Sequence, residues 1–295
     1  MLEFENISKF FQTDFWSKRF LALDSISFKI TEGKIIGFLG ANGAGKTTSI
    51  KIMMGFSKPD AGIVRYSPCL GQNKQTILSN IGYMPERPYF YPHLSGRKFI
   101  HYMGQLHNLD IKKINENSNH WSERLKIEFA LDRKISTYSK GMLQRLGFLT
   151  TLIHNPQIII LDEPVSGMDP IGRKEIKDVI KELKDLGKTI FFSTHIVPDV
   201  EEICDQVIFI DKGHLVYQGN VEDIIYQNIN HNFVIKYKSK NQLDIIEAVC
   251  QAHEKDQLIL DLLNNKREII SVNASRASLE EIFYNVRNTE RVINL

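Results

Sequence analysis

A glycine-rich segment, Gly40-Ala41-Asn42-Gly43-Ala44-Gly45-Lys46-Thr47, most constrains how this chain can fold. The apolar run Lys34–Leu39 before it is typical of a buried strand, and the residues Ser49–Met54 after it are predicted to be helical. Glycines let backbone N–H groups turn inward around a phosphate, and the start of the following helix carries partial positive charge. A chance glycine-rich turn would have to fall by accident between such a strand and such a helix. The segment therefore predicts a phosphate-binding P-loop.

Two side chains at the end of this loop indicate nucleotide chemistry. Lys46 can reach the β- and γ-phosphates of a nucleotide, and the Thr47 hydroxyl can ligate Mg²⁺. We include Thr48, the next residue, among the nucleotide-binding residues.

Two acids follow a second apolar run. Ile158–Asp162 is predicted to be a buried strand that carries Asp162 to its end, where a carboxylate can hold Mg²⁺. Glu163 comes next, where it can polarise an attacking water as a general base. Alone, the pair would be better explained as two acids in a solvated turn. Beside a P-loop, the catalytic interpretation is favoured.

His195 follows Phe191-Phe192-Ser193-Thr194, just past the end of another predicted strand. A lone histidine is more often structural. Because the carboxyl ends of parallel strands meet at one edge of a sheet, we expect His195 to contact phosphate and to act with Glu163.

Strands that alternate with helices predict an α/β fold with a mainly parallel sheet. We expect strands at Leu21–Ile30, Lys188–Ser193 and Val207–Ile210, the last in a hairpin with Leu215–Tyr217, and helices at Ser139–His154 and Ile171–Leu186. The N-terminal hairpin is expected to form an antiparallel edge of that sheet. Aromatic residues, prolines and helical spacing indicate an inserted helical subdomain at about 86–145.

The pattern changes after Gly219, so we expect one domain over 1–219 and a small α+β domain over 220–295. In the second domain we predict strands at Phe233–Tyr237 and Glu268–Val272 and a helix at Leu243–His253. Ser278-Leu279-Glu280-Glu281 has the pattern of a capping box that begins a last helix.

Composition excludes several classes of protein. A net charge of +2 is too small to indicate a nucleic-acid partner, and none is expected. Alternating Lys236, Lys238 and Lys240 are better explained as a solvated strand face. Three widely spaced cysteines fit no disulfide framework or metal motif and favour a reducing compartment. With no apolar run of about 18 residues and no signal-peptide pattern at the start, we expect a cytoplasmic protein.

A bare serine begins the helix Ser139–His154, and it makes the sequence resemble a known family. Ser139 can cap the helix with a free hydroxyl, and Gly141 leaves room for a phosphate near its positive end. Together with the P-loop and the two acids, Tyr138-Ser139-Lys140-Gly141-Met142 and then Gln144-Arg145 resemble the ATP-binding subunit of an ABC transporter over Leu2–Gly219. The family's usual signature is Leu-Ser-Gly-Gly-Gln, from which Lys140 and Met142 depart.

The resemblance implies a P-loop NTPase with a RecA-like core, ATP and Mg²⁺ as ligands, and further site residues. Asp169, in Ser166-Gly167-Met168-Asp169, matches a loop that crosses the interface between two subunits, although it can also simply cap a helix before Pro170. Glu86 stands where many members have a glutamine that reaches Mg²⁺ and water. Phe11 matches the aromatic that stacks on adenine, but Phe10, Phe15 and Trp16 compete for that role, and core packing explains it almost as well.

The resemblance also implies partners. Two ATP-binding subunits, identical or different, would enclose two ATP molecules, with Ser139 of each facing the nucleotide of the other. A separately encoded permease would hold the chain at the inner face of the cell membrane, with Pro88–Leu94 as its docking segment and export as the direction of transport. An alternative is a non-transport ABC ATPase that acts on nucleic acid or ribosomes, although the long coiled coils, zinc motifs or second cassette of such members are missing. A generic kinase or GTPase would leave the signature stretch and His195 unexplained.

Overall fold

The computed structural model describes the chain except for residues 13–15, 17–18, 228–231, 239–244, 275–278 and 285–295. The chain forms two compact units, Met1–Asn220 and Val221–Leu295. Within the described residues, none of the helices combines the length and the apolar character that crossing a membrane requires.

A six-stranded sheet lies at the centre of the first unit. Its strands are, in spatial order, β5 (Ile81–Met84), β6 (Ile158–Asp162), β7 (Thr189–Thr194), β3 (Ile35–Leu39), β8 (Gln206–Asp211) and β9 (His214–Asn220). All neighbouring pairs are parallel except β8 and β9. Leu39 pairs with Thr194, and Asp162 pairs with Ser193. The α/β fold class expected from the sequence is therefore confirmed, and the carboxyl ends of β3, β6 and β7 meet at one edge.

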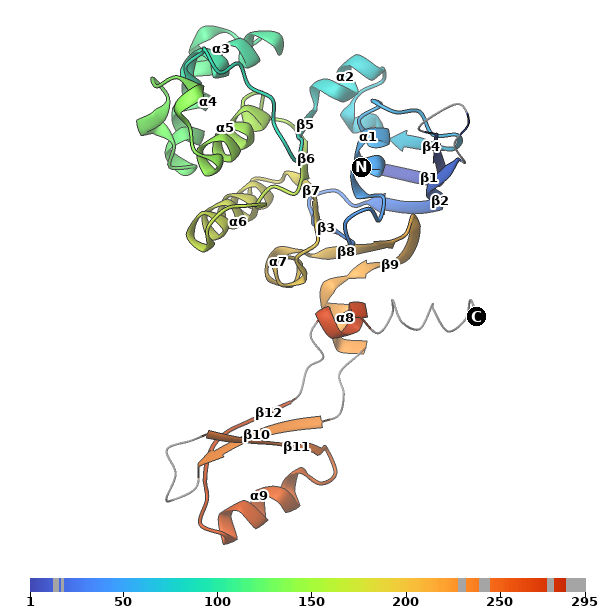
Figure 1. The fold of residues 1–295 in the computed structure, drawn as a ribbon, viewed down its shortest axis with the longest axis vertical. Coiled ribbons are helices and arrows are strands. Elements are labelled where there is room, and N and C mark those ends of the chain that lie inside the picture. Colours follow the sequence, from blue (N-terminus) through green and yellow to red (C-terminus); the bar gives the residue numbers. More distant parts are fainter. Residues whose placement is uncertain (13–15, 17–18, 228–231, 239–244, 275–278, 285–295) are drawn as a thin grey trace. The chain divides into compact units, whose positions relative to one another are not determined.

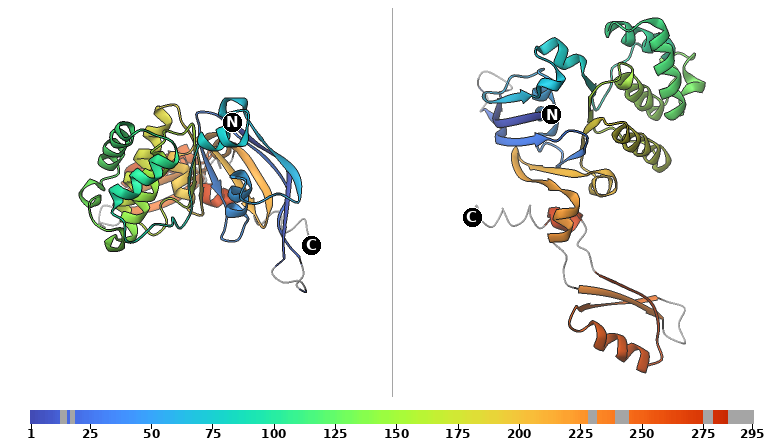
Figure 2. Two further views of the ribbon diagram at one scale, coloured as in Figure 1. Left: turned by 90° about the horizontal axis from the view of Figure 1, so that it is seen from above. Right: turned by 180° about the vertical axis from the view of Figure 1, so that it is seen from behind.

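The residues of β6 alternate between two hydrophobic cores. Ile159 and Leu161 pack in the core that includes the helices α3 (Gly96–Leu106), α4 (Ile111–Arg124), α5 (Lys140–Leu152) and α6 (Pro170–Asp185). Ile158 and Ile160 pack in the core with α1 (Lys46–Met53) and the N-terminal strands. Figures 1 and 2 show these helices and strands on opposite faces of the sheet. A parallel strand covered on both faces reads as a continuous apolar run, which is the pattern in the sequence.

The antiparallel edge of the central sheet comes from β9, which corrects the expectation that the N-terminal hairpin supplies it. The loop Lys212-Gly213 has positive φ at both residues, 46° and 84°, which suits a tight turn between β8 and β9. The N-terminal hairpin, β1 (Leu2–Phe11) with β2 (Phe20–Ile30), instead forms a separate antiparallel sheet with β4 (Ala61–Tyr66). The described residues of this unit also form α2 (Lys74–Ser79), α7 (Val197–Ile203) and a 3₁₀ turn at Pro68–Leu70.

The segment between β5 and β6 is helical. The residues before the helices α3, α4 and α5 cap them: the side chains of Ser95, Asp110 and Ser139 each accept a hydrogen bond from a backbone N–H in the first turn. Such caps satisfy orphan N–H groups and fix where each helix starts. Short 3₁₀ turns at Glu128–Ala130 and Ile135–Thr137 connect α4 to α5.

In the second unit, α8 (Val221–Gln227) precedes an antiparallel sheet of β10 (Asn232–Lys238), β11 (Ile245–Gln251) and β12 (Glu268–Ala274), with α9 (Lys255–Asn264) following β11. The helix predicted at Leu243–His253 is wrong. Cys250 is buried between exposed neighbours, which is the alternation of a strand, and pairing with β10 stabilises it. Residues 279–284 are helical where described, whereas Ser278 of the predicted capping box lies outside the described residues.

Candidate active site

The P-loop connects β3 to α1 and needs glycine at two of its positions. A Cβ at Gly40 would lie 2.5 Å from the backbone oxygen of Ile210, and one at Gly45 would lie 2.6 Å from Leu23 Cδ2. Gly45 also has a φ of 110°, a conformation that residues with a side chain rarely adopt. This left-handed residue turns the chain directly into α1 at Lys46. The helix predicted to begin at Ser49 therefore starts three residues earlier, inside the motif.

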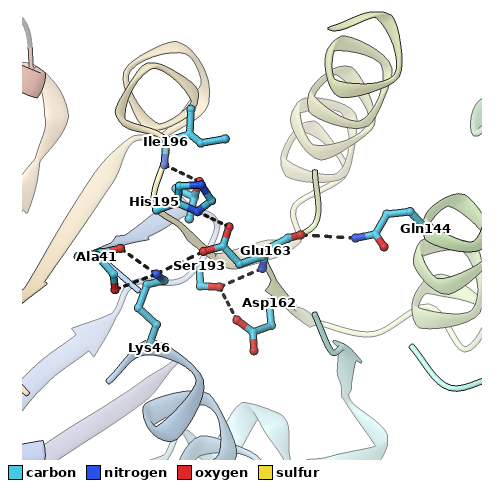
Figure 3. A network of polar contacts seen from close by, with 10 residues as sticks. Ala41, Lys46, Gln144, Asp162, Glu163, Ser193, His195 and Ile196 are labelled. Carbon is cyan, nitrogen blue, oxygen red and sulfur yellow. Dashed lines mark hydrogen bonds and ion pairs between the residues drawn. The ribbon is translucent and has the colours of Figure 1, made fainter. Parts of the chain in front are cut away.

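Lys46 joins the P-loop to the acidic strand end. Its side chain is buried, and Nζ donates hydrogen bonds to the backbone oxygens of Gly40, at 2.7 Å, and Ala41, at 3.3 Å. Nζ also lies 3.3 Å from Glu163 Oε1 in an ion pair. Figure 3 shows the ammonium between the loop carbonyls and the carboxylate. Lys46, at the start of α1, and Glu163, directly after β6, therefore face the same space.

Glu163 is held in an unusual backbone conformation at the end of β6. Its φ is 51°, in the left-handed region, and such strain persists only where the surroundings fix it. The Glu163 N–H donates to Ser193 Oγ at 3.0 Å, and Oε2 lies 3.0 Å from His195 Nδ1. The chain turns after β7 through a hydrogen bond from Ile196 N–H to Thr194 Oγ1 (Figure 3). This turn places the half-exposed His195 ring against the carboxylate.

Asp162 lies beneath Glu163 and has the chemistry of a magnesium ligand. Its carboxylate is buried, Oδ1 accepts a hydrogen bond of 2.5 Å from Ser193 Oγ, and Oδ2 has no partner among the described residues. Burial raises the pKa of the Asp162 carboxyl, the hydrogen bond from Ser193 opposes the rise, and the nearby charges of Glu86 and Glu163 add to it. The free Oδ2, the Thr47 hydroxyl and the Glu86 carboxylate are hard oxygen donors, which Mg²⁺ prefers. The residues present therefore fit this ion.

A cavity of about 430 Å³ lies over these groups. The P-loop residues Ala41, Asn42, Gly43, Gly45, Lys46, Thr47 and Thr48 line it. Glu86, which follows β5, also lines it, as do Glu163 and His195 at the ends of β6 and β7 and Ser166 after Glu163. Gly40 and Ala44 belong to the loop but do not line the cavity.

Two aromatic side chains form the apolar end of this cavity. Phe11 lines it and is partly exposed, which suits a ring that stacks on a flat ligand. Phe20 pairs opposite Phe11 across β1 and β2 and also lines it. Of the competing aromatics, Phe10 and Trp16 do not contribute to the lining, and Phe15 lies outside the described residues.

The signature residues lie elsewhere on the first unit. Ser139 is exposed, and its Oγ accepts a hydrogen bond from Met142 N–H at 3.3 Å. A Cβ added at Gly141 would meet no atom within 4 Å, so the surface beside this helix start is open. Asp169 caps α6 by accepting from Gly172 N–H at 3.0 Å. These three residues do not line the cavity that holds Lys46 and Glu163.

Three residues near the cavity carry contacts that the sequence interpretation did not assign. Ser193 joins Asp162 to Glu163, Gln144 donates from α5 to backbone oxygens at Glu163 and Pro164, and Phe20 forms a wall of the cavity. Phe20 faces Phe11 in a hairpin, a pairing that strand periodicity can suggest. The other two contacts depend on packing between segments about 20 to 30 residues apart and leave no local pattern.

Comparisons with known proteins agree with this geometry. The ABC transporter family model matches residues 23–166. An uncharacterized ABC transporter ATP-binding protein of Synechocystis is 33% identical over 96% of this chain and 83% of its own length. The bacitracin transport ATP-binding protein BcrA of Enterococcus faecalis is 35% identical over 70% of this chain and 67% of its own.

A solved structure shares the fold. It is the dimeric structure of a post-hydrolysis state of the ATP-binding cassette MJ0796 bound to ADP and Pi, and the match covers 75% of this chain and 99% of that one with a TM-score of 0.68 at 20% identity. The length and identity of the Synechocystis match, together with the P-loop cavity, show that the chain belongs to the ABC transporter family, as an ATP-binding subunit.

Proposed function

We propose that this subunit hydrolyses ATP in the cavity over Lys46 and Glu163 and uses the reaction to drive a separately encoded membrane permease. The observation that carries this proposal is the cavity itself, which joins a P-loop, two strand-end acids, a histidine and an aromatic wall. The triphosphate would lie along the P-loop and the adenine against Phe11. In phosphoryl transfer, catalysis comes mainly from positioning and from hydrogen-bond donors and cations held in place around the phosphates.

Glu163 is proposed as the general base that takes a proton from the attacking water. Its carboxylate contacts Lys46 on one oxygen and His195 on the other, so its orientation is fixed from two sides. His195 would hold the carboxylate and contact the γ-phosphate from the open side of the cavity. Thr47, Asp162 and Glu86 would hold Mg²⁺, which neutralises charge on the phosphates.

We propose that a second subunit completes each site. Ser139 and Gly141 lie at an exposed helix start outside the cavity of their own chain, with the positive end of α5 open to a phosphate. A neighbouring subunit could bring its nucleotide to this surface, and Asp169 would lie along the contact. The dimeric state of the MJ0796 cassette with ADP and Pi supports this arrangement.

The proposed permease site is a groove of about 280 Å³ beside Glu86. Pro88 and Tyr89 line it from the segment after β5, and the buried Met54 and the exposed Phe56 line it from the residues after α1. Tyr89 is 80% exposed, whereas Phe90 is buried among the helices. The aromatic segment thus both packs the subdomain and presents a free ring, which suits a helix from a partner chain. The bacitracin transport role in the name of BcrA supports transport, and we propose export as its direction.

Crosslinking in native membranes tests the permease proposal. The exposed Cys69 is first replaced by serine, and Tyr89→Cys is then introduced. Phe129→Cys is the matched control, since Phe129 is an exposed aromatic in the helical subdomain outside the groove. We expect Tyr89→Cys, but not the control, to crosslink to an integral membrane protein in an ATP-dependent manner. Crosslinks only to soluble proteins or ribosomes would instead place the chain among the non-transport ABC ATPases.

A further inference from the structure

Gln144 connects the signature helix to the backbone of the proposed base. The side chain is 4% exposed, and its Nε2 donates to the backbone oxygen of Pro164 at 2.9 Å and to that of Glu163 at 3.4 Å. Figure 3 shows the amide reaching from α5 to the turn after β6. Gln144 lies five positions after Ser139, about 7 to 8 Å along the helix axis at the usual helical rise.

The Gln144 amide contacts the backbone at a residue whose conformation is strained. Glu163 has a φ of 51°, a conformation that is held only if neighbouring groups fix it. Ser193 holds the N–H of this residue, and its backbone oxygen accepts from Ser166 N–H at 3.1 Å and from Gln144 Nε2 at 3.4 Å. The direction of the Glu163 carboxylate toward Lys46 and His195 follows from this backbone conformation.

The helix α5 is anchored on two sides. The next residue, Arg145, donates to the backbone oxygen of Leu125, in the helical subdomain, at 2.6 Å and to Glu175 Oε2, in α6, at 2.5 Å. A displacement of α5 relative to β6 would carry the Gln144 amide with it.

We propose that Gln144 is a positioning residue, through which the position of α5 determines the orientation of Glu163. Because Ser139 caps the same helix, a nucleotide of the second subunit that contacts Ser139 would thereby affect hydrolysis in the subunit's own cavity. The inference rests on the proposed two-subunit function for its second half. An uncharged amide donor of this length suits the role, because an ionised glutamate would repel the two carbonyl oxygens. Methionine would take the donor from the Pro164 oxygen and would leave the Glu163 oxygen only its hydrogen bond from Ser166 N–H.

Steady-state kinetics of Gln144→Met and Gln144→Glu test the positioning role. Met keeps the volume, so the fold is expected to survive, and Glu keeps the shape. We expect kcat to fall about 10-fold or more while the Kd for ATP changes by less than about threefold, since the P-loop is untouched. Ser122→Ala is the matched control, because Ser122 is also buried in the helical subdomain and hydrogen-bonded, but to Asn119. An unchanged kcat in both Gln144 variants, or a loss of ATP affinity equal to the loss of kcat, would overturn the assignment.

A double-mutant cycle with Glu163→Gln separates positioning from general damage. If Gln144 acts through Glu163, Gln144→Met should cause little further loss of rate once Glu163 is already replaced. If the fold-loss of kcat in the double variant equalled the product of the losses in the two single variants, the positioning role would be overturned.

Cooperativity tests the link between the two sites. The Hill coefficient for ATP hydrolysis should fall toward 1 in Gln144→Met and stay at the wild-type value in Ser122→Ala, and an unaltered coefficient in Gln144→Met would overturn the link. A wild-type coefficient of 1 with unaffected hydrolysis in Ser139→Arg would refute the two-subunit function and this link together. The kcat loss and the cycle with Glu163 would still decide the positioning role.

Discussion

His195 Nδ1 lies 3.0 Å from Glu163 Oε2, although 32 positions separate the two residues in the chain. The contact exists because β6 and β7 are parallel neighbours and end at the same edge of the sheet, where Asp162 pairs with Ser193. One carboxylate oxygen thus faces a histidine, and the other faces the P-loop lysine. A water between Glu163 and a γ-phosphate would therefore meet a proposed base whose carboxylate is already oriented.

Glu163→Gln should separate binding from hydrolysis. The amide keeps the size of the side chain but cannot accept a proton, so we expect kcat to fall by about 10² or more while ATP still binds. Lys46→Ala should instead weaken ATP binding, since the charge that faces the phosphates is removed. Hydrolysis rates and ATP titrations of both variants distinguish the two effects. Wild-type turnover in Glu163→Gln would show that another group is the base.

Ser193→Ala should destabilise the protein. Ser193 Oγ accepts from Glu163 N–H and donates to Asp162, and both partners are buried. Leaving a buried N–H unpaired costs about 1 to 3 kcal/mol, so the free energy of unfolding in urea should fall by about that amount. Ser118→Ala is the matched control, because Ser118 Oγ is buried and has no hydrogen-bond partner among the described residues. Equal losses in the two variants would mean that the Ser193 contacts contribute nothing specific.

The site residues that the sequence predicts are those that belong to short, continuous motifs. The strand before the P-loop, the acids at the end of β6 and the histidine after β7 are recognisable because each follows an apolar run, and parallel strand ends necessarily converge. The fold class followed from the same alternation of strands and helices. Gln144 and Ser193 could not be assigned in this way. A buried amide or hydroxyl has no periodicity, and its partners are set by how α5 and β7 pack on β6.

Two predictions about the fold are wrong for the same reason, because strand pairing between distant segments decides both. The run Ile245–Gln251 is short and apolar enough to read as either a helix or a strand, and pairing with β10 decides the matter. The N-terminal hairpin was expected at the edge of the central sheet, but sequence alone does not say which sheet a hairpin joins. Its β1 pairs with β4 instead.

His154 should make the stability of the protein depend on pH. Its ring stacks on that of His107, with 3.8 Å between the ring centroids. Burial, with a smaller effect of His107, lowers the pKa of His154 from 6.5 to about 4. Between these two pH values His154 is protonated in the unfolded chain but neutral in the folded chain. The free energy of unfolding therefore decreases as pH falls from about 6.5 toward about 4. At pH 5 the loss from this group is on the order of 2 kcal/mol.

The variant His154→Phe tests that dependence. Phenylalanine keeps a ring against His107 and cannot bind a proton, so the decrease in unfolding free energy from pH 7 to pH 5 should be smaller than in the wild type. Urea unfolding at both pH values gives the difference, and any constant cost of the substitution cancels. An identical pH dependence in the two proteins would show that His154 does not set it.

Ser139 should be needed for an ATP-linked dimer. If ATP bridges Lys46 of one subunit and Ser139 of another, ATP stabilises the dimer by mass action. In the Glu163→Gln background, where we expect ATP hydrolysis to be slow, size-exclusion chromatography should show a dimer with ATP and a monomer without it. Adding Ser139→Arg should abolish the dimer, because the long side chain would fill the open surface beside Gly141. Ser79→Arg, a change of equal charge at the exposed end of α2, is the control and should leave the dimer intact. A nucleotide-saturated monomer that hydrolyses ATP at the full rate would show that one chain is sufficient.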